Sequence, residues 1–194
     1  SPHGPVHRIP IPALRGPDGY LVESTTICLT PSWRVWSRLP ARPGAAYRRR
    51  AWIAGLPAPS LPGVAREVSR VSERLGEWSA ETELQPTREA MRRAGRTSGL
   101  LHLAAHGSFR RDNPTYSFVE LADGPLYAHD LAEMRLPGST VVLTACSSGR
   151  GAAPAGDEWI GLARGFLQAG ASSVVASLWP IPDEPTSELM DRFY

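Results

Sequence analysis

Two short apolar runs constrain the fold of this chain more than any other feature, because each stops abruptly at a reactive side chain. Residues 100–105 lead to His106, and residues 140–145 lead to Cys146. Each run is too brief for a helix, so both are predicted to be buried strands of an α/β sheet. Neighbouring strands lie about 4.8 Å apart, and parallel sheets bind ligands beyond the carboxyl ends of their strands. If these two strands are neighbours, His106 and Cys146 face each other across that crevice.

A cysteine nucleophile needs such a neighbour. An isolated thiol, with a pKa near about 8.5, is only a few per cent thiolate at neutral pH. His106 would take the thiol proton or pair with the thiolate, and would then protonate the leaving amine after Cys146 attacks a peptide carbonyl. The backbone N–H groups of Gly107 and Cys146 are the predicted oxyanion donors. No acidic third member is evident in the sequence.

Composition excludes several other classes of protein. The chain has 194 residues, 42% of them hydrophobic, which predicts one domain. There is neither a run of about 20 apolar residues nor a secretory signal, so we expect a cytoplasmic protein without membrane contact. Cys28 and Cys146 are too few for a disulfide scaffold or a zinc site, so we expect reduced thiols, no metal and no cofactor. A net charge of +2 and an Arg48–Arg50 run without interleaved aromatics predict no nucleic-acid partner.

The first half of the chain contains two expected strands and an amphipathic helix. Residues 20–29 are rich in β-branched side chains and predict a strand, with Cys28 as a small buried hydrophobe. A short helix is expected within 32–39 and a strand at 51–54. Apolar residues then recur at helical spacing from residue 64 to residue 75. The charged face of this helix is predicted to carry Arg66, Glu67, Arg70, Glu73 and Arg74.

The second half predicts alternating strands and helices around the two apolar runs. We expect a helix from Pro86 or Thr87 to about Ala94, a loop at 108–115, a hairpin turning at Asp123–Gly124, a short helix capped by Asp130, a loop at 147–156, a helix from Asp157 to Ala169, a strand at 173–178 and a helix from about Pro185 to Tyr194. This alternation requires parallel strands, right-handed crossovers and a sheet covered by helices.

Several short segments, taken in order, resemble the CHAT family of caspase-like domains, which are often attached to TPR repeats and are related to separases and metacaspases. The segments are Ile9–Leu14, Pro31-Ser32, His106-Gly107, Leu143–Gly149, Gly156–Glu158, Gly161–Arg164, Ala169–Ala171, Ser177–Trp179 and Phe193-Tyr194. The resemblance implies a caspase-like three-layer α/β/α sandwich with a mostly parallel central sheet and a Cys146–His106 dyad. It also implies that residues 1–194 are a single caspase-like peptidase domain, and a fragment that lacks the family's first strand and its C-terminal helix and strand.

Substrate binding is predicted just beyond the strand at 173–178. In relatives an acidic residue in this region binds a basic side chain before the cut bond, and Asp183 matches that residue. Asp183 is equally well explained as an acidic residue at a helix start, and Asp157 and Glu158 are the next acids to consider. Trp179 either lines the pocket or packs in the interior.

Other polar residues have simpler explanations. His102 precedes His106 by four residues and so shares its face of the strand, but without a third ligand it is predicted to be a hydrogen-bonded core histidine. His129 is assigned no chemistry. Arg150 is either a self-cleavage site or a solvated loop charge. Neither a Gly-x-Ser-x-Gly elbow nor a Gly-rich phosphate loop occurs.

Two function classes remain. The first is a cysteine endopeptidase that cleaves protein or peptide substrates, with TPR repeats or other sensor domains regulating it from outside this chain. The second is a non-catalytic interaction or scaffold module that keeps the fold.

Overall fold

Five parallel strands form the central sheet of the computed structural model, which describes residues 9–30, 32–37, 49–108, 110, 112–144, 159–177 and 183–194. The strands are β3 (Arg50–Gly55), β4 (Ser79–Leu84), β5 (Leu100–Ala104), β9 (Thr140–Leu143) and β10 (Ser173–Ala176). Their order across the sheet is β10-β9-β5-β3-β4, and every neighbouring pair is parallel. The two apolar runs are therefore buried, adjacent strands, as the sequence predicts.

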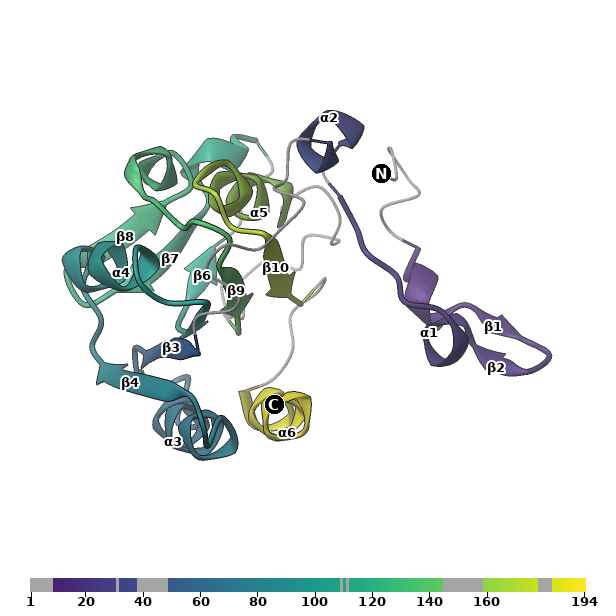
Figure 1. Cartoon of the computed structure of the whole chain (residues 1–194), viewed down its shortest axis with the longest axis horizontal. Helices are drawn as coiled ribbons and strands as arrows, with labels where there is room; N and C mark the ends of the chain where they lie inside the picture. Colours follow the sequence, from purple (N-terminus) through teal and green to yellow (C-terminus); the bar gives the residue numbers. More distant parts are fainter. Residues whose placement is uncertain are drawn as a thin grey trace.

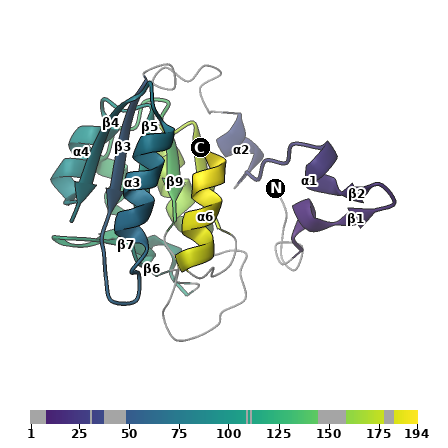
Figure 2. The same ribbon diagram turned by 90° about the horizontal axis from the view of Figure 1, so that it is seen from below.

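Helices cover both faces of this sheet (Figures 1 and 2). α3 (Val64–Arg74) and α6 (Asp183–Phe193) lie on one face, where Ile53, Val71 and Met190 belong to one apolar cluster. α4 (Arg88–Gly95) and α5 (Trp159–Gln168) lie on the other, where Trp52, Met91 and Phe166 belong to a second cluster. Successive side chains alternate between these two clusters along β3, β9 and β10. The predicted three-layer α/β/α sandwich is confirmed.

A second, three-stranded antiparallel sheet follows β5. It consists of β6 (Gly107–Ser108), β7 (Phe118–Leu121) and β8 (Gly124–Tyr127), with a short 3-10 helix, Pro114–Tyr116, between β6 and β7. The predicted hairpin at Asp123–Gly124 is confirmed, and Gly124 has a φ of 110° that suits glycine there. A second 3-10 helix, Asp130–Glu133, comes next; Asp130 does not cap it but accepts a hydrogen bond from the Tyr127 N–H.

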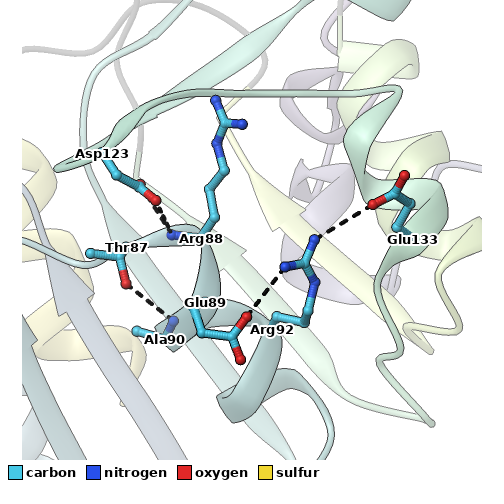
Figure 3. Close-up of polar contacts among 7 residues, drawn as sticks. All are labelled: Thr87, Arg88, Glu89, Ala90, Arg92, Asp123 and Glu133. Atoms are coloured by element: carbon cyan, nitrogen blue, oxygen red, sulfur yellow. Dashed lines mark hydrogen bonds and ion pairs between the residues drawn. The ribbon is translucent and has the colours of Figure 1, made fainter.

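This hairpin is joined to α4 (Figure 3). The Arg88 N–H donates to both carboxylate oxygens of Asp123 at 3.1 Å, and the Ala90 N–H donates to the Thr87 hydroxyl at 3.2 Å. Both bonds satisfy backbone donors that the first turn of a helix leaves without partners. Further along the helix, Arg92 bridges Glu89 and Glu133. The small sheet is thereby fixed against the helix layer of the sandwich.

The N-terminal elements are a 3-10 helix (Ile11–Ala13), β1 (Arg15–Gly16), β2 (Gly19–Tyr20), α1 (Leu21–Ser24) and α2 (Trp33–Trp36). The short helix predicted within 32–39 is confirmed by α2, whereas the elements before it differ from the prediction. The prediction of a strand at 20–29 is wrong. The Glu23 carboxylate accepts a hydrogen bond from the Tyr20 N–H at 2.7 Å and closes a helical turn. Residues 25–30, which follow this turn, belong to no sheet. Cys28 is exposed rather than buried. A β-branched run forms a strand only where a sheet edge receives it, and none of the described residues in 9–37 is buried.

Strand β4 was not predicted. It forms the edge of the central sheet, and its residues are largely exposed, include the acids Glu81 and Glu83, and show no apolar period. Its acids have partners on neighbouring elements: Glu83 accepts from the Trp52 indole at 3.1 Å, and Glu81 pairs with Arg93 at 2.9 Å. Backbone pairing with β3 and these contacts stabilise a strand whose side chains bury little.

Candidate active site

His106 lies at the carboxyl edge of the central sheet. It follows the last residue of β5 by two positions and its side chain is half-buried. Its backbone carbonyl accepts from the Glu120 N–H of β7 at 2.7 Å, so the small sheet fixes the main chain that carries the imidazole. The predicted base is therefore where parallel sheets bind their ligands.

Ser60 contacts this imidazole and was not predicted. Its Oγ lies 2.7 Å from His106 Nε2, and its own side chain is exposed. Ser60 belongs to the loop between β3 and α3, which is held in place by Leu61, a buried residue that packs with Val64 and Ala104. Strand β3 neighbours β5, so this loop begins at the same edge as His106. The contact between Ser60 and His106 follows from the strand order, which a single sequence does not reveal.

Gly107 forms the start of β6, and its backbone orientation follows from the strand register. Gly107 pairs with Val119, and the flanking bond runs from the Glu120 N–H to the His106 carbonyl. In an antiparallel ladder this pattern marks a non-hydrogen-bonded pair, whose N–H groups point away from the partner strand. The Gly107 N–H is thus directed away from β7.

Several predicted site residues lie outside the described part of the chain. These are Cys146, Asp157, Glu158, Trp179 and the loop residue Arg150. Asp183 is the first residue of α6, but its side chain is not among those described. The approach to Cys146 is described as far as Thr144, whose N–H donates to the Leu103 carbonyl at 3.1 Å and extends the β5–β9 ladder by one bond.

A buried polar cluster lies beneath the edge that carries His106. Glu67 of α3 is 2% exposed and His102 of β5 is fully buried. Glu67 Oε1 lies 2.8 Å from His102 Nε2 and accepts from the Thr144 hydroxyl at 2.6 Å. The Tyr194 hydroxyl lies 3.1 Å from His102 Nδ1. We call Glu67, His102, Thr144 and Tyr194 the buried polar cluster.

The buried polar cluster confirms one prediction and corrects another. His102 is a hydrogen-bonded core histidine, as expected. Glu67, by contrast, does not lie on the charged face of its helix; it lies on the buried face with Val64, Val68 and Val71. Gly55 contributes to this packing, because a Cβ there would lie 2.4 Å from Val64 Cγ1 and would hold α3 away from the sheet.

Burial also raises the pKa of the Tyr194 hydroxyl, and the nearby charge of Glu67 adds to the effect. Tyr194 therefore keeps its proton at neutral pH. At the surface beside it, the Arg74 guanidinium makes a two-pronged pair with Asp191 and lowers the pKa of that carboxyl. Both contacts join α6 to the α3 side of the sandwich.

The contacts of His129 are structural and give no reason to assign it a catalytic role. Its Nδ1 lies 3.1 Å from the Thr115 carbonyl, and its ring stacks on Tyr127 at a centroid distance of 5.3 Å. Among the described residues, no group of three or more His, Cys, Asp or Glu side chains is arranged to hold a metal ion. No helix in the described ranges has the length and apolar character needed to cross a membrane.

Comparison with known proteins settles the family. The CHAT domain profile matches residues 1–194. The chain belongs to the CHAT domain family. This CHAT chain is also 38% identical over 69 residues to tetratricopeptide repeat protein 28 of the mouse, a match that covers 36% of the chain and 3% of that protein. The chain thus spans a very small part of the length of this curated relative.

Two solved structures are similar to this CHAT chain at low identity. One is a flavodoxin of Streptococcus pneumoniae TIGR4, with 15% identity, a TM-score of 0.45, and coverage of 74% of this chain and 94% of that one. The other is a short-chain flavodoxin associated with a bacterial microcompartment, with 15% identity, a TM-score of 0.45, and coverage of 74% and 93%. The family, rather than these structures, characterises the chain as a caspase-like, peptidase-related module.

Proposed function

We propose that this CHAT domain is a cysteine endopeptidase in which Cys146 is the nucleophile and His106 the base. The register of β5 and β9 carries the proposal. Leu100 pairs with Thr140 and Leu103 with Leu143, and His106 and Cys146 each follow that last pair by three residues. This register supports the proposal, because two adjacent parallel strands end at the same edge of the sheet and the sequence has a base and a thiol at matching positions after them.

In the proposed mechanism, the Cys146 thiol transfers its proton to His106 and the thiolate attacks the carbonyl carbon of the scissile peptide bond. The tetrahedral intermediate collapses as the C–N bond breaks, and His106 gives the proton to the leaving amine. Water then attacks the thioester, His106 takes a proton from it, and that proton returns to the thiolate as the acid product leaves. Because Ser60 contacts Nε2, we assign the proton transfers to Nδ1 of His106.

The oxyanion is assigned to the backbone N–H groups of Gly107 and Cys146. The orientation of the Gly107 N–H away from β7 supports this assignment, because a donor used in the ladder could not bind substrate. Glycine at this position also lets a substrate backbone approach closely. One such donor typically contributes about 10²–10³ to the rate.

We propose that the enzyme cuts after arginine and that Asp183 binds the arginine side chain. Two observations support a pocket here: β10 neighbours β9, so the chain leaves it at the edge that carries the dyad, and α6 begins at Asp183. A shielded carboxylate favours arginine through paired charge-assisted hydrogen bonds. Trp179 is proposed as a pocket wall, and Asp157 and Glu158 are the alternative acids.

We further propose that residues 1–194 act as one peptidase domain on protein substrates in the cytoplasm, under the control of other domains. The match to a mouse protein named for its tetratricopeptide repeats supports TPR repeats as the regulatory neighbours. Such repeats form extended concave surfaces that bind other chains.

The deciding experiment replaces the two dyad residues separately. Digestion of a peptide library by the parent, followed by kinetics on the best peptide, should give cleavage that Cys146→Ala abolishes and His106→Ala lowers by orders of magnitude. Both variants should keep the parent's fold, because alanine is smaller than either side chain that it replaces. If Cys146→Ala cleaves as fast as the parent, the nucleophile is assigned wrongly; near-normal activity in His106→Ala would rule out the Cys-His mechanism.

Alkylation separates the peptidase from a scaffold that merely keeps the fold. Cys28 is an exposed thiol of the same chain and is therefore an internal reference. In a peptidase, iodoacetamide should modify Cys146 much faster than Cys28, since an activated thiolate reacts faster than an ordinary thiol. Equal or slower modification of Cys146, together with no cleavage of the library, would favour the scaffold.

A further inference from the structure

Burial of the carboxylate in the buried polar cluster is unfavourable for the stability of the fold. Glu67 occupies a position on α3 flanked by Val64, Val68 and Val71, in the layer between helix and sheet. Removing a carboxylate from water costs several kcal/mol, and a well-packed apolar residue is often as stable or more stable at such a site. Packing alone therefore does not explain a carboxylate here. Its contacts indicate what it does.

Glu67 ties together the two strands that lead to the proposed dyad. A single oxygen, Oε1, contacts His102 on β5 and the hydroxyl of Thr144 just after β9. His106 follows His102 by four residues, and Cys146 follows Thr144 by two. The last backbone bond described between these strands also ends at Thr144, at its N–H. The carboxylate thus fixes the chain where the regular ladder stops.

The side chains of the cluster can form one consistent set of hydrogen bonds. Burial raises the pKa of the Tyr194 hydroxyl, so the group keeps its proton and can donate to His102 Nδ1. His102 then carries its own proton on Nε2 and donates it to Glu67. Thr144 donates its hydroxyl proton to the same carboxylate. Each donor in this set has an acceptor, so all four side chains of the cluster are hydrogen-bonded although they lie in or against the core.

We propose that Glu67 is a positioning residue of the peptidase site, which holds Thr144 and His102 so that the segments after β9 and β5 present Cys146 and His106 in a fixed relation. This inference rests on the proposed function. Thr144 is the contact through which Glu67 acts on the nucleophile, and His102 is the contact through which it acts on the base. Small displacements matter at such a site, since a shift of about 1 Å can cost about a hundredfold in rate.

The test compares Thr144→Val with Thr144→Ser in the full chain. Valine keeps the shape of threonine but cannot donate to Glu67, whereas serine restores the hydroxyl without the methyl group. We expect Thr144→Val to lower kcat at least about tenfold with KM changed less than about twofold, because the lost contact aligns reacting groups rather than binding substrate. Thr144→Ser should return kcat to within about threefold of the parent. Glu67→Leu, which removes the acceptor of both bonds, should lower kcat in the same way.

A control variant separates positioning from stability. Val71 lies on the same face of α3 and is fully buried, but it belongs to the apolar cluster with Ile53 and Met190. Val71→Ala should lower the melting temperature while kcat stays within about twofold of the parent. If it lowers kcat as much as Thr144→Val does at an equal loss of melting temperature, the cluster is merely structural and the inference is overturned. Failure of Thr144→Ser to restore kcat would have the same meaning.

Alkylation distinguishes failure of this inference from failure of the proposed function. Rates of iodoacetamide modification at Cys146 and Cys28 are measured by mass spectrometry in each variant. If the parent cleaves peptides and both Thr144→Val and Glu67→Leu keep its kcat, the inference fails and the peptidase stands. If the parent cleaves nothing, a slower Cys146 reaction in Thr144→Val that Thr144→Ser restores, with Cys28 constant, supports positioning alone. An unchanged Cys146 rate would overturn both proposals.

Discussion

Ser60 shows how one exposed side chain can matter at the candidate site. Its only described polar contact is with His106 Nε2, at 2.7 Å. Without it, the imidazole loses a hydrogen bond that holds the orientation of its ring. Such a bond contributes about 1 kcal/mol, which is about fivefold in rate. We therefore expect Ser60→Ala to lower kcat/KM about fivefold on the best library peptide, without changing the melting temperature.

Ser69→Ala is the matched control for this prediction. Ser69 is also exposed and also makes one side-chain hydrogen bond, to Glu73 of α3 at 3.1 Å, but it does not contact His106. It should keep the parent's kcat/KM. Equal activity of Ser60→Ala and Ser69→Ala would show that Ser60 does not orient the base.

Single residues also show what a sequence can and cannot reveal. Glu67 lies three residues after Val64 and four before Val71, so helical spacing alone places it on the buried face. Because Glu67 is charged, the sequence predicts that it lies on the exposed face of the helix. The partners that permit its burial, His102 and Thr144, are 35 and 77 residues away in the chain. Only the fold brings them together.

At the level of elements, the buried segments were predictable, and of the exposed ones the short helix α2 was predicted but β4 and the elements before residue 25 were not. The strands β5 and β9 are apolar on both faces, which their sequences show directly. Strand β4 has the burial pattern of a sheet edge, and its sequence resembles that of a charged loop. Residues 20–29 have strand-forming composition but no sheet to join. Local composition predicts an element only where packing agrees with it.

Gly161 lies where helix α5 packs closely against the 3-10 helix at Pro114, and this packing can be tested. It lies in α5, and a Cβ there would meet the Pro114 carbonyl oxygen at 2.4 Å, so helix and 3-10 turn touch through backbone. Alanine normally favours a helix over glycine by about 0.5–1 kcal/mol. At Gly161 the clash with Pro114 outweighs this helix preference, so alanine should destabilise the protein. We expect Gly161→Ala to lower the free energy of unfolding by about 1–3 kcal/mol.

Thermal or urea unfolding measures this effect. Gly16→Ala is the control, because a Cβ at Gly16 meets no atom within 4 Å. It should change the free energy of unfolding by less than about 0.5 kcal/mol. A Gly161→Ala variant as stable as the parent, or more stable, would mean that α5 does not pack so closely on the segment at Pro114.

At the scale of the whole molecule, the strand order decides which residues share an edge. The sequence predicts parallel strands but not that β5 lies between β9 and β3. That order brings the Ser60 loop, His106 and the segment leading to Cys146 to one end of the sheet. The helix α6 then connects two regions, since it begins at Asp183 of the proposed pocket and is followed directly by Tyr194 of the buried polar cluster.

The position of Asp183 yields the last prediction, which concerns specificity. A carboxylate that binds arginine contributes about 1.5–3 kcal/mol through a charged hydrogen bond. Asp183→Asn should therefore lower kcat/KM for arginine peptides at least about tenfold, while peptides with citrulline, which has nearly the same shape without the charge, change little. The rate of Cys146 alkylation should stay the same. Glu188→Gln, which removes one charge from an exposed position of the same helix, should leave the arginine-to-citrulline ratio unchanged.

This ratio separates the pocket from the other explanation of Asp183. An acidic residue at a helix start is favourable without any substrate, because it lies near the positive end of the helix dipole. If that is the whole role of Asp183, Asp183→Asn lowers the melting temperature and leaves the ratio of arginine to citrulline cleavage as in the parent. The same measurement on Asp157→Asn and Glu158→Gln then identifies the acid that binds the arginine side chain of the substrate. Library cleavage after aspartate or after an apolar residue would overturn arginine specificity altogether, because no carboxylate is needed to bind either side chain.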